Sequence, residues 1–213
     1  MGKLAAIFYP ASWPLGYLHG TMDEIYRLNI FDDVRLTADA VVVDAGANIG
    51  QVTRALSPLV KRVYAIEADP DIFQVLKRNR DYNAWDNVSV HHFALNVQDS
   101  PVTFHRYTDN PFAGTLVWDG GGGDVTVPGK SLGTFMAEEG IDHIHFLKLD
   151  IEGAEHALIQ ADDFAEVANR IDTILLEQHY DDTPALSTRL RQLGFREERR
   201  PFIPKAIHLF HKQ

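Results

Sequence analysis

Residues 40–69 read AVVVDAGANIGQVTRALSPLVKRVYAIEAD. The run that begins at Ala40 is apolar and β-branched, as in a fully buried strand, and it ends in a turn that contains Gly46 and Gly50. Apolar residues then recur at helical spacing, and a second apolar run ends on Glu67. Strand, glycine turn, helix, strand and acid in this order are typical of half of a doubly wound nucleotide-binding sheet. The sequence therefore predicts an α/β fold with a mostly parallel sheet.

The same turn indicates which ligand the sheet binds. A dinucleotide site requires G-x-G-x-x-G, because a pyrophosphate must approach the backbone and the helix N-terminus. Asp44 occupies the first glycine position here, and its carboxylate would repel a pyrophosphate. The carboxylate is compatible with S-adenosylmethionine, which has no phosphate and bears a sulfonium and an ammonium. Glu67 follows Asp44 by 67 − 44 = 23 residues, close to the ~20 at which an acid binds a ribose hydroxyl.

The residues predicted to bind this cofactor lie in the turn and just after the second strand. Gly46 lets the backbone turn sharply and lets a ligand approach, since it has no Cβ. Gly50 lets the start of the helix pack close to the strand. The predicted cofactor-binding residues of this unit are Asp44, Gly46, Ala47, Asn48, Gly50, Glu67 and Ala68.

Two separated motifs, DAGANIGQ from Asp44 and LKLDIEGAE from Leu147, together resemble the FkbM family of S-adenosylmethionine-dependent methyltransferases. The resemblance extends from about residue 38 to the C-terminus. It implies a class I methyltransferase (Rossmann-like) fold, with a mostly parallel seven-stranded sheet and an antiparallel C-terminal strand. It also implies methyl transfer to an oxygen of a small molecule or sugar. Class I enzymes hold the adenine where the third strand ends, which implies a contact with Ala94 and Leu95.

Composition limits the class of protein and its partners. The chain has 213 residues, of which 45% are hydrophobic, as expected for one α/β domain over 38–213 preceded by a segment over 1–37. It contains no cysteine, which excludes disulfides and thiolate metal sites and is compatible with the reducing cytoplasm where we expect it. The net charge of −10 disfavours a nucleic-acid partner. No apolar run reaches the ~18 residues of a membrane span, and no sequence feature indicates an oligomeric state.

The segment before the fold allows two interpretations. It contains aromatic residues interrupted by prolines, so a regular helix is not expected at Trp13 and Tyr17. The segment either packs against the sheet or forms a lid over the acceptor site, with these two rings as stacking surfaces. Residues 21–28 are expected to form a short helix, because Thr21 and Glu24 have the spacing of a capping box.

The middle of the chain is expected to leave the regular alternation of strands and helices. A helix from Pro70 should direct Tyr82 toward the sheet, and 88–95 should form the third strand. Residues 102–105 and 124–127 are typical of a hairpin. The four glycines from Gly120 favour a flexible loop over a phosphate cradle, because no basic residue is close.

Candidate catalytic residues follow the fourth and fifth strands. Asp150 ends the strand that begins at residue 144, and Glu152 lies in the next turn, so both are candidate acids at the reacting centre. Lys148 shares a strand face with Asp150, and a buried lysine there needs a partner, either Asp150 or Glu177. Glu155 is interpreted as a first-turn acid stabilised by the helix dipole.

His179 follows the fifth strand, 171–177, and is predicted to lie beside Asp150. It is the first choice of general base, since histidine titrates near neutral pH, and Asp150 would orient it or the acceptor. The alternative is a divalent cation held by Asp150, Glu152 or Glu177, with His179 as a further possible ligand.

Three other classes of protein stay open at this point. A nicotinamide-dependent oxidoreductase is disfavoured by Asp44. An RNA methyltransferase is disfavoured by the acidic charge and the lack of an appended RNA-binding region. A non-catalytic S-adenosylmethionine-binding or scaffold protein would have the same motifs.

Overall fold

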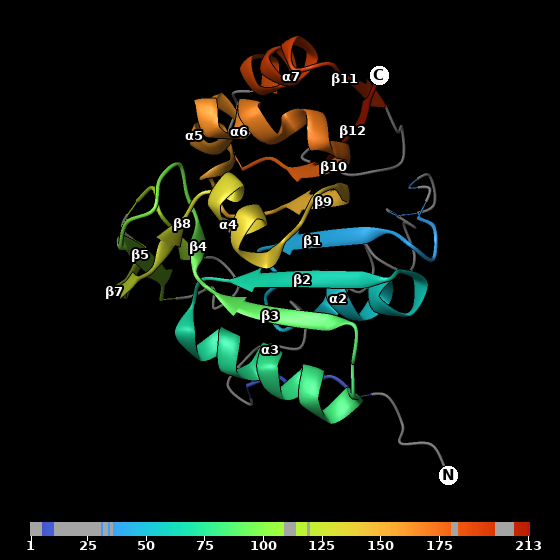
Figure 1. Cartoon of the computed structure of the whole chain (residues 1–213). Helices are drawn as coiled ribbons and strands as arrows, with labels where there is room; N and C mark the ends of the chain where they lie inside the picture. The colour runs from blue at the N-terminus through green and yellow to red at the C-terminus, as the bar shows by residue number, and fades with distance from the viewer. Residues whose placement is uncertain are drawn as a thin grey trace.

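The computed structural model describes residues 6–10, 31, 34, 36–108, 114–118, 120–179, 183–198 and 207–213 (Figure 1). The predicted lid residues Trp13 and Tyr17 and the helix predicted over 21–28 lie outside these ranges. Within them, no helix is both long and apolar enough to cross a bilayer.

A seven-stranded sheet in the order β3-β2-β1-β9-β10-β12-β11 forms the centre of the fold (Figure 1). Its strands are β1 (Val41–Ala45), β2 (Arg62–Glu67), β3 (Val88–His92), β9 (Ile144–Leu149), β10 (Ile171–Glu177), β11 (Phe195–Glu198) and β12 (Ile207–Lys212). Strand β12 is antiparallel to both of its neighbours, whereas the pairs among the other strands are parallel. The predicted class I architecture is confirmed.

Helices cover both faces of this sheet. They are α2 (Gln51–Leu56), α3 (Pro70–Asn83), α4 (Leu132–Glu139), α5 (Glu155–Gln160), α6 (Asp162–Val167) and α7 (Thr183–Gln192). In β1, Val42 packs with α2 and α3, whereas Val43 packs with α4 to α7. In β9, Phe146 packs in the same core as Val42, and Leu147 packs in the same core as Val43. Successive side chains of a strand point to opposite faces, so continuously apolar strands require helices on both sides.

The predicted third strand is wrong at its end. The ladder with β2 stops at His92, and after Phe93 the short strand β4 (Ala94–Leu95) pairs with β8 (Gly129–Lys130) instead. In α3 the prediction for Tyr82 is also wrong, because its side chain is exposed while Leu76 faces the core.

A second, three-stranded sheet lies beyond the carboxyl ends of β2 and β3 (Figure 1). It consists of β5 (Val102–Tyr107), β6 (Gly114–Thr115) and β7 (Gly121–Val127), which confirms the hairpin. The flexible-loop prediction is wrong for Gly121–Gly123, which begin β7. A Cβ on Gly122 would lie 2.6 Å from the backbone carbon of Tyr107, so glycine permits the close pairing.

The described residues near the N-terminus lie mainly against α3. The backbone of Ala6 bonds to Asn83, and that of Phe8 bonds to Asn79 in both directions. Phe31 contacts the sheet directly, with its ring edge-on to Phe146.

Candidate active site

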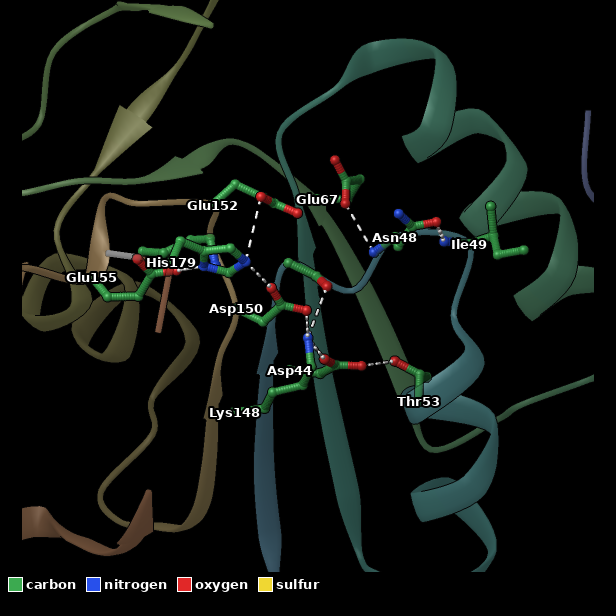
Figure 2. A network of polar contacts seen from close by, with 12 residues as sticks. Asp44, Asn48, Ile49, Thr53, Glu67, Lys148, Asp150, Glu152, Glu155 and His179 are labelled. Carbon is green, nitrogen blue, oxygen red and sulfur yellow. Dashed lines mark hydrogen bonds and ion pairs between the residues drawn. The ribbon is translucent and has the colours of Figure 1, made fainter. Parts of the chain in front are cut away.

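Asp44 lies beneath the turn rather than on its surface. Its side chain is fully buried at the end of β1, and Thr53 Oγ1 donates to its Oδ2 at 2.6 Å (Figure 2). Burial raises the pKa of Asp44, and the nearby Lys148 ammonium opposes this rise. Among the described residues, no hydrogen-bond donor reaches Asp44 Oδ1, which is also buried.

Gly46 makes room for the backbone of a neighbouring turn, and the ligand approach predicted there stays a prediction. Its φ is +75°, and a Cβ there would lie 1.7 Å from the carbonyl oxygen of Asp150. The turn after β1 therefore contacts the turn after β9. Gly50 serves packing too, because its Cβ would lie 2.8 Å from Leu76 Cδ1 and 3.2 Å from the ring of Trp85.

Glu67 ends β2 next to this turn and is fixed by main-chain donors. Its two carboxylate oxygens accept from the backbone N–H groups of Asn48 and Asp69, each at 2.8 Å. The side chain is 8% exposed, and burial raises the pKa of Glu67 to about 7, against the effect of these donors. Asn48 has a φ of 52°, and its Oδ1 accepts from the Ile49 N–H. Glu67 therefore keeps a fixed orientation, with lone pairs left for a hydroxyl donor.

The other predicted cofactor residues have different surroundings. Ala47 is buried in the core under the turn, and Ala68 is half-buried, with its carbonyl oxygen 3.1 Å from His92 Nε2. Ala94 and Leu95 are buried in the β4–β8 pair, and Leu95 belongs to the main core. Their contact with an adenine stays a prediction.

Lys148 joins the turn after β1 to the turn after β9. Its Nζ donates to the Gly46 carbonyl at 3.1 Å and to Asp150 Oδ2 at 2.8 Å, and it lies 3.8 Å from Asp44 Oδ1 (Figure 2). Burial opposes the charge, yet Asp150 and Asp44 raise the pKa of Lys148 above its ordinary value. Asp150 is thus the predicted hydrogen-bond partner, whereas Glu177 adds to the shift only through its charge.

His179 is surrounded by three carboxylates. Its Nδ1 lies 3.1 Å from Glu155 Oε1, and its Nε2 lies 3.4 Å from Glu152 Oε2 and 3.7 Å from Asp150 Oδ1 (Figure 2). The structure thus brings together the three residues predicted to be catalytic. Glu155 forms the hydrogen bond with the imidazole and Asp150 lies farther from it, so the role of Asp150 in orienting the histidine or the acceptor stays a prediction.

Glu155 is the member of this cluster whose contact with His179 was not predicted. Its side chain is 2% exposed, and it also accepts from the backbone N–H groups of Ile151 and Gly153, each at 2.8 Å. The sequence did contain one indication of this contact, because Glu155 follows Glu152 by only three residues. Glu155 does lie in the first turn of α5, as predicted, and its contact with His179 is additional to that position.

Glu152 has an unusual backbone conformation. Its φ is 53°, which is uncommon for a residue with a Cβ. Thr115 of β6 is fully buried and donates its hydroxyl to the Glu152 carbonyl at 2.5 Å. The second sheet therefore supports the turn that presents Glu152, and strained conformations of this kind cluster at functional sites.

Two groups of this cluster, His179 and Glu152, have shifted pKa values. Burial opposes protonation of His179, but the hydrogen bond that its Nδ1–H donates to Glu155 and the charge of Glu152 raise the pKa of His179 to about 9. Burial raises the pKa of Glu152 to about 7, and the charge of His179 opposes that rise. At neutral pH the imidazole is therefore protonated, and Glu152 is near its midpoint.

The same cluster contains a possible set of metal ligands. Ligand atoms of Asp150, Glu152 and His179 all lie within 4.8 Å of one another. Glu177, predicted as an alternative ligand, is not a member of this group.

Comparison with known proteins identifies the family. Residues 44–197 match the model of the methyltransferase FkbM domain. The chain belongs to the FkbM methyltransferase family. S-adenosylmethionine is its cofactor, and the site fits this molecule: the buried acceptor Asp44 Oδ1, the acid Glu67 and the surrounding carboxylates suit ammonium, ribose and sulfonium groups.

Two curated relatives of this FkbM protein are also named as methyltransferases. Methyltransferase 1 of Beauveria bassiana is 24% identical over 88% of this chain and 85% of its own length. A probable ribosomal RNA small subunit methyltransferase A of Thermococcus onnurineus is 35% identical over 38% of this chain and 28% of its own.

Solved structures show the same fold. An FkbM methyltransferase from Methylobacillus flagellatus has a TM-score of 0.55 and 18% identity; the match covers 87% of this chain but only 46% of that one. A putative methyltransferase from Streptococcus mutans, solved in complex with SAH, has a TM-score of 0.51 and 12% identity, with 96% and 100% covered.

Proposed function

We propose that this FkbM protein methylates a hydroxyl group of a small polar molecule, such as a sugar. The observation that supports this proposal is the cluster of Glu152 and His179 beside the turn that follows β1, whose Asn48 N–H binds Glu67 at the end of β2. S-adenosylmethionine, when bound, supplies a methyl group that is already activated. The protein has to align the acceptor and remove its proton.

Glu67 and Asp44 are the proposed cofactor ligands. Glu67 would accept from the ribose, because Asn48 and Asp69 fix its carboxylate in place. Asp44 Oδ1 would accept from the amino group, since the other oxygen is used by Thr53. Acid-rich surroundings favour a ligand with two positive charges.

Glu152 is the proposed proton acceptor, and His179 the imidazolium that stays beside it. A general base is most effective when its pKa is near the working pH, and the pKa of Glu152 is raised to about 7. His179, with a pKa of about 9, already carries its proton at neutral pH. These charges favour Glu152 over His179, the first choice from the sequence. Glu155 would act as the positioning residue for the imidazole.

A pH profile separates the two assignments. After an acceptor has been found with radiolabelled S-adenosylmethionine, kcat/KM should rise with pH and level off just above 7 if Glu152 is the base. A rise that continues to about 9 would return the role to His179. The variant Glu152→Gln should lose about 10²- to 10⁴-fold in kcat while SAH binding, measured by calorimetry, is kept.

A divalent cation is a second candidate for activation of the acceptor. It is supported by the grouped ligand atoms of Asp150, Glu152 and His179, and a bound cation would lower the pKa of the acceptor hydroxyl. Activity that is lost on treatment with EDTA and restored by Mg²⁺ would establish this route. Chelator-insensitive turnover would eliminate it.

The acceptor is proposed to be neutral and not a nucleic acid. The net charge of −10 and the carboxylates around His179 would repel phosphodiesters. One relative is named as a probable rRNA methyltransferase, but its match covers only 38% of this chain. Methylation of an RNA oligonucleotide faster than of any sugar or phenol would refute this proposal. NADH binding, or SAH binding without any turnover, would favour the oxidoreductase or scaffold class.

A further inference from the structure

The second sheet is fixed to both sides of the proposed site. At one side, Arg106 of β5 donates to both oxygens of Asp69, at 2.6 and 2.9 Å, and Asp69 itself bonds to Glu67. At the other side, Thr115 of β6 donates to the Glu152 carbonyl. The sheet β5–β7 therefore lies beside both Glu67, the proposed ribose ligand, and Glu152, the proposed base. We call this sheet the wall of the site.

Two exposed apolar side chains extend from this wall. Val117 and Trp118 lie two and three residues after the end of β6 and are 50% and 39% exposed. Since consecutive Cα atoms are about 3.8 Å apart, the Cα of Trp118 lies within about 11 Å of that of Thr115. Thr115 in turn touches Glu152, and its Oγ1 accepts from the Val117 N–H at 3.1 Å. The backbone of Trp118 therefore lies in the short segment that follows the Thr115 contact with Glu152.

Tyr107 fixes the orientation of this indole. The Trp118 Nε1–H donates to the Tyr107 hydroxyl, so the two aromatic side chains form one unit. Burial and then the charge of Glu152 raise the pKa of Tyr107, which places the phenol within electrostatic range of the proposed base. A Cβ on Gly120 would lie 2.8 Å from the Tyr107 ring, so glycine there lets the ring pack against the backbone.

We propose that Trp118, held by Tyr107, is the platform on which the ring of a neutral pyranoside acceptor stacks. This inference rests on the proposed function. A sugar ring offers a face of C–H groups to the indole, and its hydroxyls can donate to the carboxylates of Glu152 and Asp150. Aromatic side chains provide large contact area with a fixed geometry, and a few polar groups then fix orientation.

Charge decides between a sugar and a nucleobase, which would also stack on an indole. A nucleotide would bring a phosphate toward Glu152, Asp150 and the exposed Asp71. Arg106, the cation on this wall, is already paired with Asp69 and Asp71. A neutral ring therefore fits this surface better than a nucleotide.

Ligand-observed saturation-transfer NMR on the SAH-saturated full chain tests the platform. The probes are methyl β-D-glucopyranoside, methyl α-D-mannopyranoside, the open-chain polyol sorbitol and AMP. We expect the pyranosides to bind more tightly than sorbitol and AMP. Trp118→Ala should weaken pyranoside binding roughly tenfold, the loss expected for one stacked ring, whereas Trp118→Phe should stay within about threefold of wild type.

Leu59→Ala is the matched control, because Leu59 is also an exposed apolar residue, at 57%, but lies in the 3-10 helix Ser57–Leu59 that precedes β2, away from the carboxyl ends. It should leave pyranoside binding unchanged. Equal binding by wild type and Trp118→Ala, no pyranoside binding by wild type, or preference for AMP would each overturn the platform. Calorimetry with SAH distinguishes failure of the platform from failure of the proposed function. If the wild-type protein did not bind SAH, the proposed methyl transfer itself would be refuted.

Discussion

Replacement of Gly46 by alanine should destabilise the protein by about 3 kcal/mol and disable the site. The residue has a φ of +75°, and a left-handed conformation costs an L-residue about 1–2 kcal/mol. The new Cβ would also lie 1.7 Å from the Asp150 carbonyl oxygen, an overlap that only a backbone shift can relieve. Overpacking of this kind adds about 1–3 kcal/mol. The shift would move Asp150, which accepts from Lys148 and which is predicted to lie at the reacting centre.

Gly140→Ala is the control for this prediction. Gly140 also has a positive φ, of +65°, at the end of α4, but a Cβ there would have no atom within 4 Å. It should cost only the backbone term, about 1–2 kcal/mol. Urea unfolding followed by circular dichroism measures both losses, and calorimetry with SAH reports on the site. Equal losses in the two variants, or unchanged SAH affinity in Gly46→Ala, would refute the close approach of the two turns.

Three further predictions concern buried acids. The folded state raises the pKa of Glu67 from an ordinary 4.5 to about 7, so it binds this proton more tightly than the unfolded chain does; the free energy of unfolding should fall by about 3 kcal/mol between pH 4.5 and 7. Urea unfolding across this range checks the fall, which should be about 3 kcal/mol smaller in Glu67→Gln; Glu152, whose pKa is also raised to about 7, contributes to the fall that is left. Thr53→Val removes the donor to buried Asp44 and should cost about 1–3 kcal/mol in the same assay, with Thr53→Ser close to wild type. Glu155→Gln should lower the pKa of His179, since it removes the charge at Nδ1; an unchanged imidazole titration by NMR would contradict the positioning role.

Much of the fold could be predicted because its signals are local. Apolar strands, the turn after Asp44 and an acid at Glu67 lie within thirty residues, and they predict the parallel sheet. The break at Phe93 could not be predicted, since it depends on pairing of β4 with β8 more than thirty residues later. The glycines that begin β7 look like a loop until Tyr107 of the paired strand is placed beside them.

The site was predictable where strand ends determine it. Asp150, Glu152 and His179 follow neighbouring parallel strands, so topology alone brings them together. Glu155 and Trp118 could not be assigned, because their roles depend on burial and on a sheet whose position the sequence does not indicate. The protonation of His179 was equally hidden, since it follows from the sum of three nearby charges.

The single ammonium of Lys148 has a consequence for protein engineering. It ties the Gly46 carbonyl of one turn to the Asp150 carboxylate of the other, and the two turns also touch directly. Neither turn can be exchanged alone without a mismatch in the other, so both should be transplanted as one module. New acceptor specificity is better sought by diversifying the loop after Thr115, which borders the module but is not built into it.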